Sequence, residues 1–332
     1  MRDGLLLVDK DCGLTSHDVV QRVRRVLRQK KIGHCGTLDP DATGLLLLTL
    51  GTATRLTRFL IRAPKVYEGT IRFGISTDTY DAAGQVVAEA PPEAVRALTR
   101  EAVEEAMRRF EGTIEQQPPP YSAKKVQGVK YYELARRGEE IPADTKEVTV
   151  FELSPQGALE DGRIGFRLAC SSGTYARGLA HDVGQALGCG AHLASLRRIK
   201  IGHFPVEDAV TLPRLEEAVG KAAQAVSPES PDGEEAPEAP ETPAMSEAAA
   251  GVGRAWIPFD EIPLPFDEVT ADPQQENRIA HGQTVLVREL RGDEGDWVKL
   301  INRRREFIAV GTVVERIGTA GVGIVQPRVV FR

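Results

Sequence analysis

The sequence has little of what places a protein in a membrane, in an oxidising compartment or around a metal ion. Its apolar runs, such as residues 45–48, are far shorter than the roughly 20 residues of a membrane-spanning helix. The N-terminus lacks the apolar stretch of a signal peptide. The 4 cysteines and 6 histidines are scattered without a Cys-x-x-Cys pair or metal-ligand spacing. We therefore expect a cytoplasmic protein with reduced thiols, no membrane contact, no metal ion and no disulfide framework.

Charge is spread unevenly along the chain, which has a formal net charge of −6. Residues 222–253 hold seven acidic side chains and no lysine or arginine, so the other 300 residues hold 42 basic and 41 acidic groups. Residues 1–66 hold 12 basic and 6 acidic groups, and residues 278–332 hold 10 and 6. Both ends of the chain are therefore basic, which is compatible with an anionic partner.

The acidic segment also divides the chain. Residues 222–255 are rich in Ala, Pro and Glu, and they hold too few large apolar side chains to offset the entropy lost on ordering. This composition predicts a disordered linker between a large domain, residues 1–221, and a small domain, residues 256–332. The total length also suggests roughly two domains.

Both helical and strand periodicities occur in the large domain. Strands are predicted at residues 44–50, 66–74, 147–153 and 163–171. Helices are predicted at residues 19–28, 99–110, 130–137 and 174–187. Because these elements interleave without a regular β-α-β period, we expect an α+β fold with a mixed, largely antiparallel sheet.

The small domain has short β segments separated by glycines and charged turns. They are predicted at residues 285–288, 297–301, 307–313 and 322–331. Such spacing favours a small β-barrel or sandwich.

The most unusual stretch is GHCGTLDPDATG at residues 33–44, which places a histidine and two carboxylates just before an apolar strand. Taken by itself it fits a surface turn, because Asp-Pro and Thr-Gly are common turn pairs. A calcium loop is disfavoured because alternating acidic ligands and a distal glutamate are missing. From these residues alone a turn and a catalytic loop both remain open.

This stretch resembles the signature of the TruB family of tRNA pseudouridine synthases. Five further stretches match the family in the same order: GLTSHDVV at 13–20, KVY at 65–67, TDTYD at 77–81, QQPPPYSAK at 116–124 and CSSGTYARGLAHD at 170–182. The chain departs from the family pattern at Asp11, where the family usually has proline, and the acidic segment has no counterpart. The C-terminal segment is similar to the small RNA-binding PUA-type domain of many relatives.

The resemblance implies an isomerase that converts uridine-55 of the tRNA T-loop to pseudouridine without a cofactor. The partner is then tRNA, bound through its T-arm, and a monomer is expected. Asp39 matches the catalytic position, where a carboxylate acts near C1′ of the ribose. Whether Asp39 attacks C1′ or removes a sugar proton stays open. Asp41 falls at a variable position of the motif and is assigned a turn or surface role.

The same resemblance implies substrate-binding residues around Asp39. Tyr67 matches an aromatic residue that stacks on the displaced base, and Tyr175 matches a pocket residue. Arg177 is the expected guanidinium that favours the ionised carboxylate. The remaining expected tRNA contacts are His34, Asp81 and Lys10. Each residue also has an ordinary alternative: a packed tyrosine, a surface arginine, a turn aspartate or a solvated lysine.

Several basic groups could contact phosphates, although each is also typical of a solvated face. They are the arginines of helix 19–28, Lys30, Lys31, Lys124, Lys125, Lys130, Arg197, Arg198, Lys200 and Arg303 to Arg305. Two other functions remain open: an RNA-binding folding factor for the T-arm, and the catalytic subunit of a guide-RNA particle. The presence of Asp39 favours an enzyme over a folding factor. The stretch DATGLL at 41–46 resembles the stand-alone branch of the family more than the guide-RNA branch, which shares the Asp-containing core.

Overall fold

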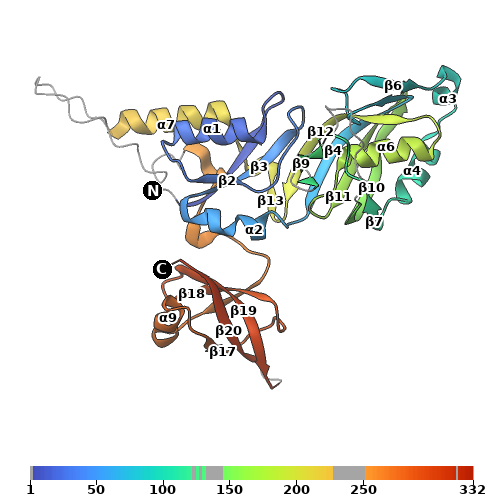
Figure 1. The fold of residues 1–332 in the computed structure, drawn as a ribbon. Coiled ribbons are helices and arrows are strands. Elements are labelled where there is room, and N and C mark those ends of the chain that lie inside the picture. The colour runs from blue at the N-terminus through green and yellow to red at the C-terminus, as the bar shows by residue number, and fades with distance from the viewer. Residues whose placement is uncertain are drawn as a thin grey trace, which may run out of the picture.

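A computed structural model describes residues 3–121, 125–126, 129–131, 145–226, 251–318 and 321–331 of the protein (Figure 1). One mixed sheet runs through the large part of the molecule in the order β14-β1-β3-β12-β4-β11-β10-β7, with β2, β13 and β15 pairing beside this path. Its neighbours are antiparallel except for β1 with β14 and β12 with β3. This confirms the predicted α+β fold with a mixed, largely antiparallel sheet.

The strands of this sheet have the following bounds. They are β1 (Gly4–Lys10), β2 (Ile32–His34), β3 (Thr43–Leu50), β4 (Lys65–Phe73), β7 (Gly112–Gln116), β10 (Lys146–Glu160), β11 (Arg163–Cys170), β12 (Ala191–Ile201), β13 (Phe204–Pro205), β14 (Val210–Thr211) and β15 (Trp256–Pro258). Two small hairpins accompany it, β5 (Ile75–Thr77) with β6 (Val86–Glu89) and β8 (Lys125–Val126) with β9 (Val129–Lys130). The four predicted strands are confirmed as β3, β4, β10 and β11, of which β10 is much longer than predicted.

Helices cover the sheet in two groups. The helices are α1 (Ser16–Val26), α2 (Thr57–Leu60), α3 (Pro92–Arg96), α4 (Arg100–Arg108), α6 (Ala176–Ala186) and α7 (Leu212–Val226). Those predicted at 19–28, 99–110 and 174–187 are confirmed as α1, α4 and α6. The helix predicted at 130–137 lies mostly outside the described residues, and its first residue, Lys130, belongs to strand β9.

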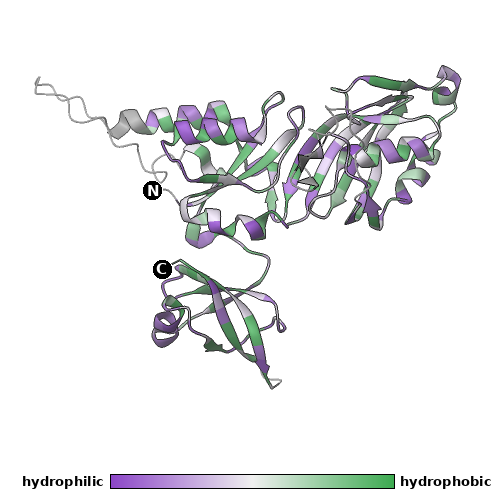
Figure 2. Ribbon diagram, viewed as in Figure 1, coloured by the Kyte–Doolittle hydropathy of each residue, from purple (hydrophilic) through white to green (hydrophobic). Residues whose placement is uncertain are grey.

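Two hydrophobic cores result from this arrangement. The first packs β1 and β3 against α1 and α7, and the second packs β4, β10 and β11 against α4 and α6. Figure 2 shows hydrophobic residues along the strands and alternating hydrophilic and hydrophobic residues along α1, α6 and α7. Strand β12 joins the two halves, because it pairs with β4 over most of its length and with β3 at Arg197 and Arg198.

The small C-terminal part is a β half-barrel of five strands in the order β16-β18-β19-β20-β17. Its elements are β16 (Asp267–Thr270), α9 (Pro273–Ala280), β17 (Val285–Val287), β18 (Trp297–Ile301), β19 (Phe307–Ile317) and β20 (Val322–Val330). All four predicted segments are confirmed, and β16 is added to them. Aromatic rings dock this part against the first core, for example Phe59 on Trp297 with ring centroids 4.8 Å apart.

The structure adds detail around the predicted linker. Helix α7 continues to Val226, and β15 pairs with β1 as part of the large sheet, so the sheet of the small part begins only at β16. Most of the predicted linker, residues 227–250, lies outside the described residues, and the domain division stays a prediction. Among the described residues, no helix is long and apolar enough to cross a membrane.

Candidate active site

A cavity of about 600 Å³ opens where the two halves of the sheet meet. One wall is the loop that follows β2, with Gly36 to Asp39, and another is the start of α6 with Tyr175 and Arg177. The floor is formed by strand residues, among them Tyr67 of β4 and Arg198 of β12. The structure therefore gathers Asp39, Tyr67, Tyr175 and Arg177, which are far apart in the sequence, around a single hollow.

The carboxylate of Asp39 is bound by the guanidinium of Arg177 through two atoms. Nε of Arg177 lies 3.0 Å from Oδ2 of Asp39, and Nη2 lies 3.2 Å from Oδ1. This side-on arrangement fixes the orientation of the carboxylate as well as its position. Arg177 is thus no surface arginine, since its side chain is only 8% exposed.

Arg177 also contacts oxygen atoms of residues other than Asp39. Besides Asp39, Nη1 donates to the carbonyl of Thr79 at 3.0 Å and lies 3.2 Å from Oδ2 of Asp81, and Nη2 donates to the carbonyl of Tyr121 at 3.1 Å. The guanidinium therefore has five close contacts with oxygen atoms of four residues, three of them hydrogen bonds. Asp81, expected to contact tRNA, has its carboxylate on this arginine, so the structure places it in the support of the site.

Burial raises the pKa of Asp39 above its ordinary value, while Arg177 opposes that rise and Asp81 and Asp41 add to it. The side chain remains 41% exposed toward the cavity. Arg177 acts in the direction expected from the sequence, but desolvation outweighs it. A carboxylate whose ionised form is only partly stabilised is a stronger base, which suits a group that must react.

Tyr67 and Arg198 stand opposite each other on neighbouring strands, where β4 and β12 pair. Burial raises the pKa of the Tyr67 hydroxyl, and the charge of Arg198 opposes that rise. Tyr67 therefore presents a neutral phenol to the cavity. Its ring packs against the second core and also lines the cavity, so the packing interpretation is confirmed and the stacking role stays a prediction.

Tyr175 precedes the first turn of α6, and the side chain of Gln116 holds its backbone. In the sequence, Gln116 is only the first residue of the stretch at 116–124 that resembles the family. Gln116 Oε1 accepts from the Tyr175 N–H at 2.8 Å, and Gln116 Nε2 donates to the Tyr175 carbonyl at 2.9 Å. Gln116 is buried at the end of β7. It thereby fixes the peptide that positions both the Tyr175 ring and the beginning of α6.

Lys10 is buried rather than exposed, which differs from its expected contact with tRNA. Its ammonium donates to the carbonyls of Asp11 at 2.9 Å, Leu14 at 2.7 Å and Pro40 at 2.9 Å. All three donors are used, so no N–H remains for a phosphate. Lys10 instead ties the loop that carries Asp39 to the loop before α1, and a charged side chain at this depth requires such partners.

Arg198 is likewise no surface contact, since it is 1% exposed. Its Nε donates to the Leu45 carbonyl at 2.7 Å and Nη2 to the Gly36 carbonyl at 3.1 Å. Only glycine fits at position 44, because φ is +98° and a side chain there would collide with the Arg198 backbone. The side chain of Arg198 and the backbone of β12 thus contact the loop that carries Asp39 and the start of β3.

His34 and Asp41 lie away from the cavity. His34 ends β2, and its pKa is lowered by burial and by the positive charge of Arg198. Asp41 is exposed, as expected for a turn residue. A residue missed from the sequence is Lys65, which is buried in the cavity wall and whose pKa burial lowers to about 8. A contact of His34 with tRNA stays a prediction.

The predicted phosphate contacts have mixed outcomes. Lys30, Lys31 and Lys200 are exposed, whereas Arg197 forms a two-point ion pair with Asp9 at 2.9 and 2.7 Å. Lys124 and the side chains of Lys125 and Lys130 lie outside the described residues. Within the part of the chain that the structure describes, no group of three or more His, Cys, Asp or Glu side chains could hold a metal ion.

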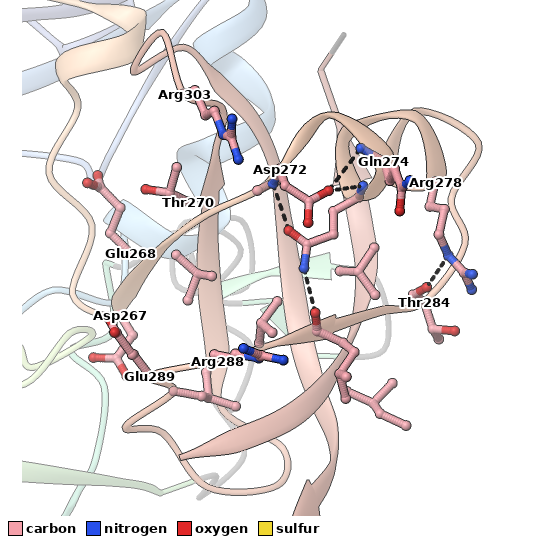
Figure 3. Close-up of a pocket in the computed structure, with 18 of the residues that line it drawn as sticks. Asp267, Glu268, Thr270, Asp272, Gln274, Arg278, Thr284, Arg288, Glu289 and Arg303 are labelled. Carbon is pink, nitrogen blue, oxygen red and sulfur yellow. Dashed lines mark hydrogen bonds between the residues drawn. The ribbon is translucent and has the colours of Figure 1, made fainter. Parts of the chain in front are cut away.

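The small part has a larger cavity of about 1420 Å³ between β16, α9 and β17 (Figure 3). Both signs of charge line it, with Asp267 and Glu289 among the carboxylates and Arg278, Arg288 and Arg303 among the guanidiniums. Asp272 caps α9 by accepting from two backbone N–H groups at 2.8 and 2.9 Å. Glu268 in the lining of this cavity is paired with Lys299 and Arg305, whereas Asp39 is held side-on by one buried arginine between two tyrosines, so the cavity at Asp39 is the better candidate for catalysis.

The effect of burial on a carboxyl group near the site can be tested at Asp182, which lies on α6. Burial alone raises the pKa of this carboxyl to about 6. Below about pH 4 it is protonated in both the folded and the unfolded chain. Between about pH 4 and 6 only the folded chain keeps its proton, so stability falls as the pH rises through this window and stays lower above it.

We therefore expect Asp182→Asn to raise the free energy of unfolding by about 1–2 kcal/mol at pH 7, after allowance for solvent screening, and to leave it unchanged near pH 3.5. Thermal or urea unfolding at the two pH values measures this difference. An equal effect at both would show that the asparagine acts through packing and not through charge.

Comparison with known proteins agrees with the geometry. Residues 24–176 match the family model of the TruB family pseudouridylate synthase N-terminal domain, and residues 177–231 match that of the tRNA pseudouridylate synthase B C-terminal domain. The tRNA pseudouridine synthase B of Solibacter usitatus (strain Ellin6076) is 40% identical over 313 residues, which are 94% of this chain and 96% of the relative. That of Azoarcus sp. (strain BH72) is 50% identical over 214 residues, or 64% and 70%.

A solved structure supports the fold alone. The chain resembles, with a TM-score of 0.69 and 24% identity, a chain in the structure of an H/ACA RNP bound to a substrate RNA containing 2'-deoxyuridine, over 99% of this chain and 85% of that one. The sequence matches extend through the segments that carry Asp39, Tyr67, Tyr175 and Arg177. The protein therefore belongs to the TruB family of pseudouridylate synthases and is an isomerase of that class.

Proposed function

We propose that this protein isomerises uridine-55 in the T-loop of tRNA to pseudouridine, with Asp39 as the catalytic carboxylate. Membership of the TruB family makes it a tRNA pseudouridine synthase, and the position of the uridine and the roles of the residues are the proposal. The observation that carries it is the carboxylate of Asp39, held by Arg177 at the edge of a cavity with two tyrosines.

The reaction leaves the composition of the RNA unchanged. The bond between C1′ and N1 breaks, the uracil turns in the cavity, C5 bonds to C1′, and the proton that C5 loses is balanced by one gained at N1. Asp39 assists at the sugar, either by bonding to C1′ or by removing a ribose proton. Neither route calls for an oxidant or a group donor.

The two tyrosines receive the base in this proposal. Because a base within a stacked loop cannot turn over, it must leave the stack, and a neutral aromatic ring offers a replacement surface. Tyr67 provides that surface from the floor of the cavity. Tyr175, whose backbone is fixed by Gln116, borders the cavity at the start of α6 and assists removal of the proton from C5.

We further propose the division of labour expected from the sequence. The large domain, residues 1–221, carries out the reaction on the T-arm, and the small PUA-like domain, residues 256–332, adds contacts to the rest of the tRNA, joined by the acidic linker of residues 222–255. The protein then works as a monomer in the cytoplasm, without metal or organic cofactor. A folded loop with one extruded base suits such a protein better than a duplex.

The decisive experiment uses the purified full chain and a T-arm stem-loop without added metal or nucleotide. We expect stoichiometric conversion of one uridine to pseudouridine, measured by release of tritium from [5-³H]uridine or by chemical mapping. A stem-loop in which that uridine is replaced by cytidine is the matched control. Tight binding without any product, across several T-arm sequences, would favour the RNA-folding function instead.

A further inference from the structure

A third hollow lies at the C-terminal end of α1. It has a volume of about 670 Å³ and is lined by six residues, which we call the α1 basic pocket: Gln21, Arg24, Arg25, Arg28, Gln29 and Lys30. Four of the six are cations and none is acidic. We propose that this pocket binds backbone phosphates of the RNA substrate, as an anchoring site separate from the cavity at Asp39. This inference rests on the proposed function.

The cations of the pocket differ from Arg22 on the same helix. Arg22 forms a two-point ion pair with Glu216 of α7, at 2.5 and 2.9 Å. Arg24, by contrast, donates from Nη2 to the Ile32 carbonyl at 2.9 Å, while its Nε is buried with no hydrogen-bond partner. In the described parts of the chain, no carboxylate pairs with the four cations of the pocket. A buried N–H without a partner is unfavourable, so Arg24 is held beside the pocket with fewer acceptors than Arg22 or Arg177 has.

Arg28 adds a backbone observation. Its φ is +48°, in the left-handed region, where helices usually place glycine just after their last turn. The N–H of Arg28 bonds the carbonyl of Arg25 at 3.3 Å, and that of Gln29 bonds the carbonyl of Arg24 at 3.1 Å, which closes the helix end. Glycine would close it with less strain, so the backbone alone does not account for an arginine here.

Compensation of the helix dipole is the simpler explanation for basic residues at this place. The C-terminus of a helix has roughly half a negative charge, which a single cation offsets. Four cations exceed that need. The arginines of α4 show the usual arrangement, since Arg100 and Arg108 pair with Glu104 and Arg109 pairs with Glu105. On α1 the one acidic residue is Asp18, which caps the opposite end.

The pocket lies within reach of an RNA bound at Asp39. At the start of α1, Ser16 Oγ accepts from the N–H of Leu38, the residue before Asp39, at 2.9 Å. The 11 residues of α1 then span about 16 Å to the pocket. An RNA helix presents phosphates every few ångströms along each strand, so one arm is long enough to reach from the cavity at Asp39 to the α1 basic pocket.

The test compares two charge-matched double variants of the full chain. Arg25→Gln with Arg28→Gly removes two cations of the pocket and relieves the left-handed strain, so the fold is retained, as thermal unfolding would verify. Arg108→Gln with Arg109→Gln removes two cations of α4 as the control. Affinity for an unmodified tRNA transcript and for its isolated T-arm stem-loop is measured at several salt concentrations.

For the pocket variant we expect the slope of log affinity against log salt to become shallower by about 2 and the affinity for tRNA to fall roughly 10-fold at 0.1 M salt. The α4 variant should match the wild type. If the stem-loop loses affinity equally, the phosphates belong to the T-arm, and if only tRNA does, they belong to another arm. Unchanged affinity and slope for both RNAs overturn the inference. Failure of the proposed function shows separately, as absence of product from the wild type.

Discussion

Asp39→Asn is expected to reduce pseudouridine formation by about 10⁴-fold or more, because the amide can neither attack C1′ nor accept a ribose proton. Binding of the T-arm stem-loop should stay within about 3-fold of the wild type. The fold should survive, because the substitution preserves shape and Arg177 keeps its contacts with Asp81, Thr79 and Tyr121. Single-turnover kinetics at saturating protein separate the chemical step from binding.

Asp41→Asn is the matched control for this prediction. Asp41 lies in the same loop, two residues further on, and is exposed. Its removal should change the single-turnover rate by less than about 3-fold, on the general expectation that surface substitutions have small effects. Product formation by the Asp39→Asn protein within 100-fold of the wild type, or an equal loss in both variants, would contradict the assignment of Asp39.

Arg177→Met is expected to damage both activity and stability. Removing a buried cation leaves Asp39 and Asp81 facing each other without compensation, which we expect to lower the free energy of unfolding by about 2–4 kcal/mol, since both carboxylates keep some solvent. Activity should fall by about 10³-fold, because the carboxylate loses its orientation. Removal of the guanidinium also changes the electrostatic environment of the Asp39 carboxylate.

The pH profile distinguishes these contributions. Without the guanidinium, the pKa of Asp39 rises further above its ordinary value, because Arg177 is the group that opposes the rise caused by burial. The acid limb of kcat/KM, where activity is lost as the carboxylate takes up a proton, should therefore move to higher pH. Arg177→Lys keeps the positive charge but lacks the planar guanidinium. The acid limb of its kcat/KM profile should therefore move less than that of Arg177→Met, while its rate remains reduced.

Arg167→Met is the control for Arg177→Met. Arg167 also lies between two carboxylates, with Nη1 3.1 Å from Glu68 and Nε 3.5 Å from Glu152, but at the surface. Exposed pairs contribute little, so we expect a loss below about 1 kcal/mol and an unchanged pH profile. A similar loss of stability in Arg177→Met and Arg167→Met would mean that the contacts of Arg177 with Asp39 and Asp81 stabilise the fold no more than an exposed ion pair does.

Much of the site could be predicted because short motifs carry its residues. Asp39, Tyr67, Tyr175 and Arg177 each lie in a stretch whose order and spacing match the TruB family, and the structure brings all four to one cavity. The confirmed strands have clear apolar patterns bounded by glycine, proline or aspartate. Strand β12, however, contains Arg197, Arg198 and Lys200, and these charges conceal its pattern.

The residues that support the site could not be predicted in the same way. Lys10 and Arg198 were expected at the surface because charged side chains are rarely buried. They are buried because backbone carbonyls from loops distant in sequence bind them, at Pro40 for Lys10 and at Gly36 for Arg198, with the nearby Leu14 carbonyl also accepting from Lys10. Such convergence is a property of the folded chain and leaves no local pattern. The role of Gln116 could not be predicted for the same reason, because its partner is the distant backbone of Tyr175.

The way the two halves of the sheet are joined has a mechanical consequence. Strand β12 pairs with β3 at only two positions, Arg197 with Thr43 and Arg198 with Gly44, next to the loop that holds Asp39. Asp39 is thus carried by the loop between β2 and β3 of the first half, whereas Arg177 lies on α6, which packs in the second core. We expect a twist of one half of the sheet against the other to change the alignment of the Asp39 carboxylate with the Arg177 guanidinium, so that an RNA which bends the sheet on binding also changes the reactive geometry.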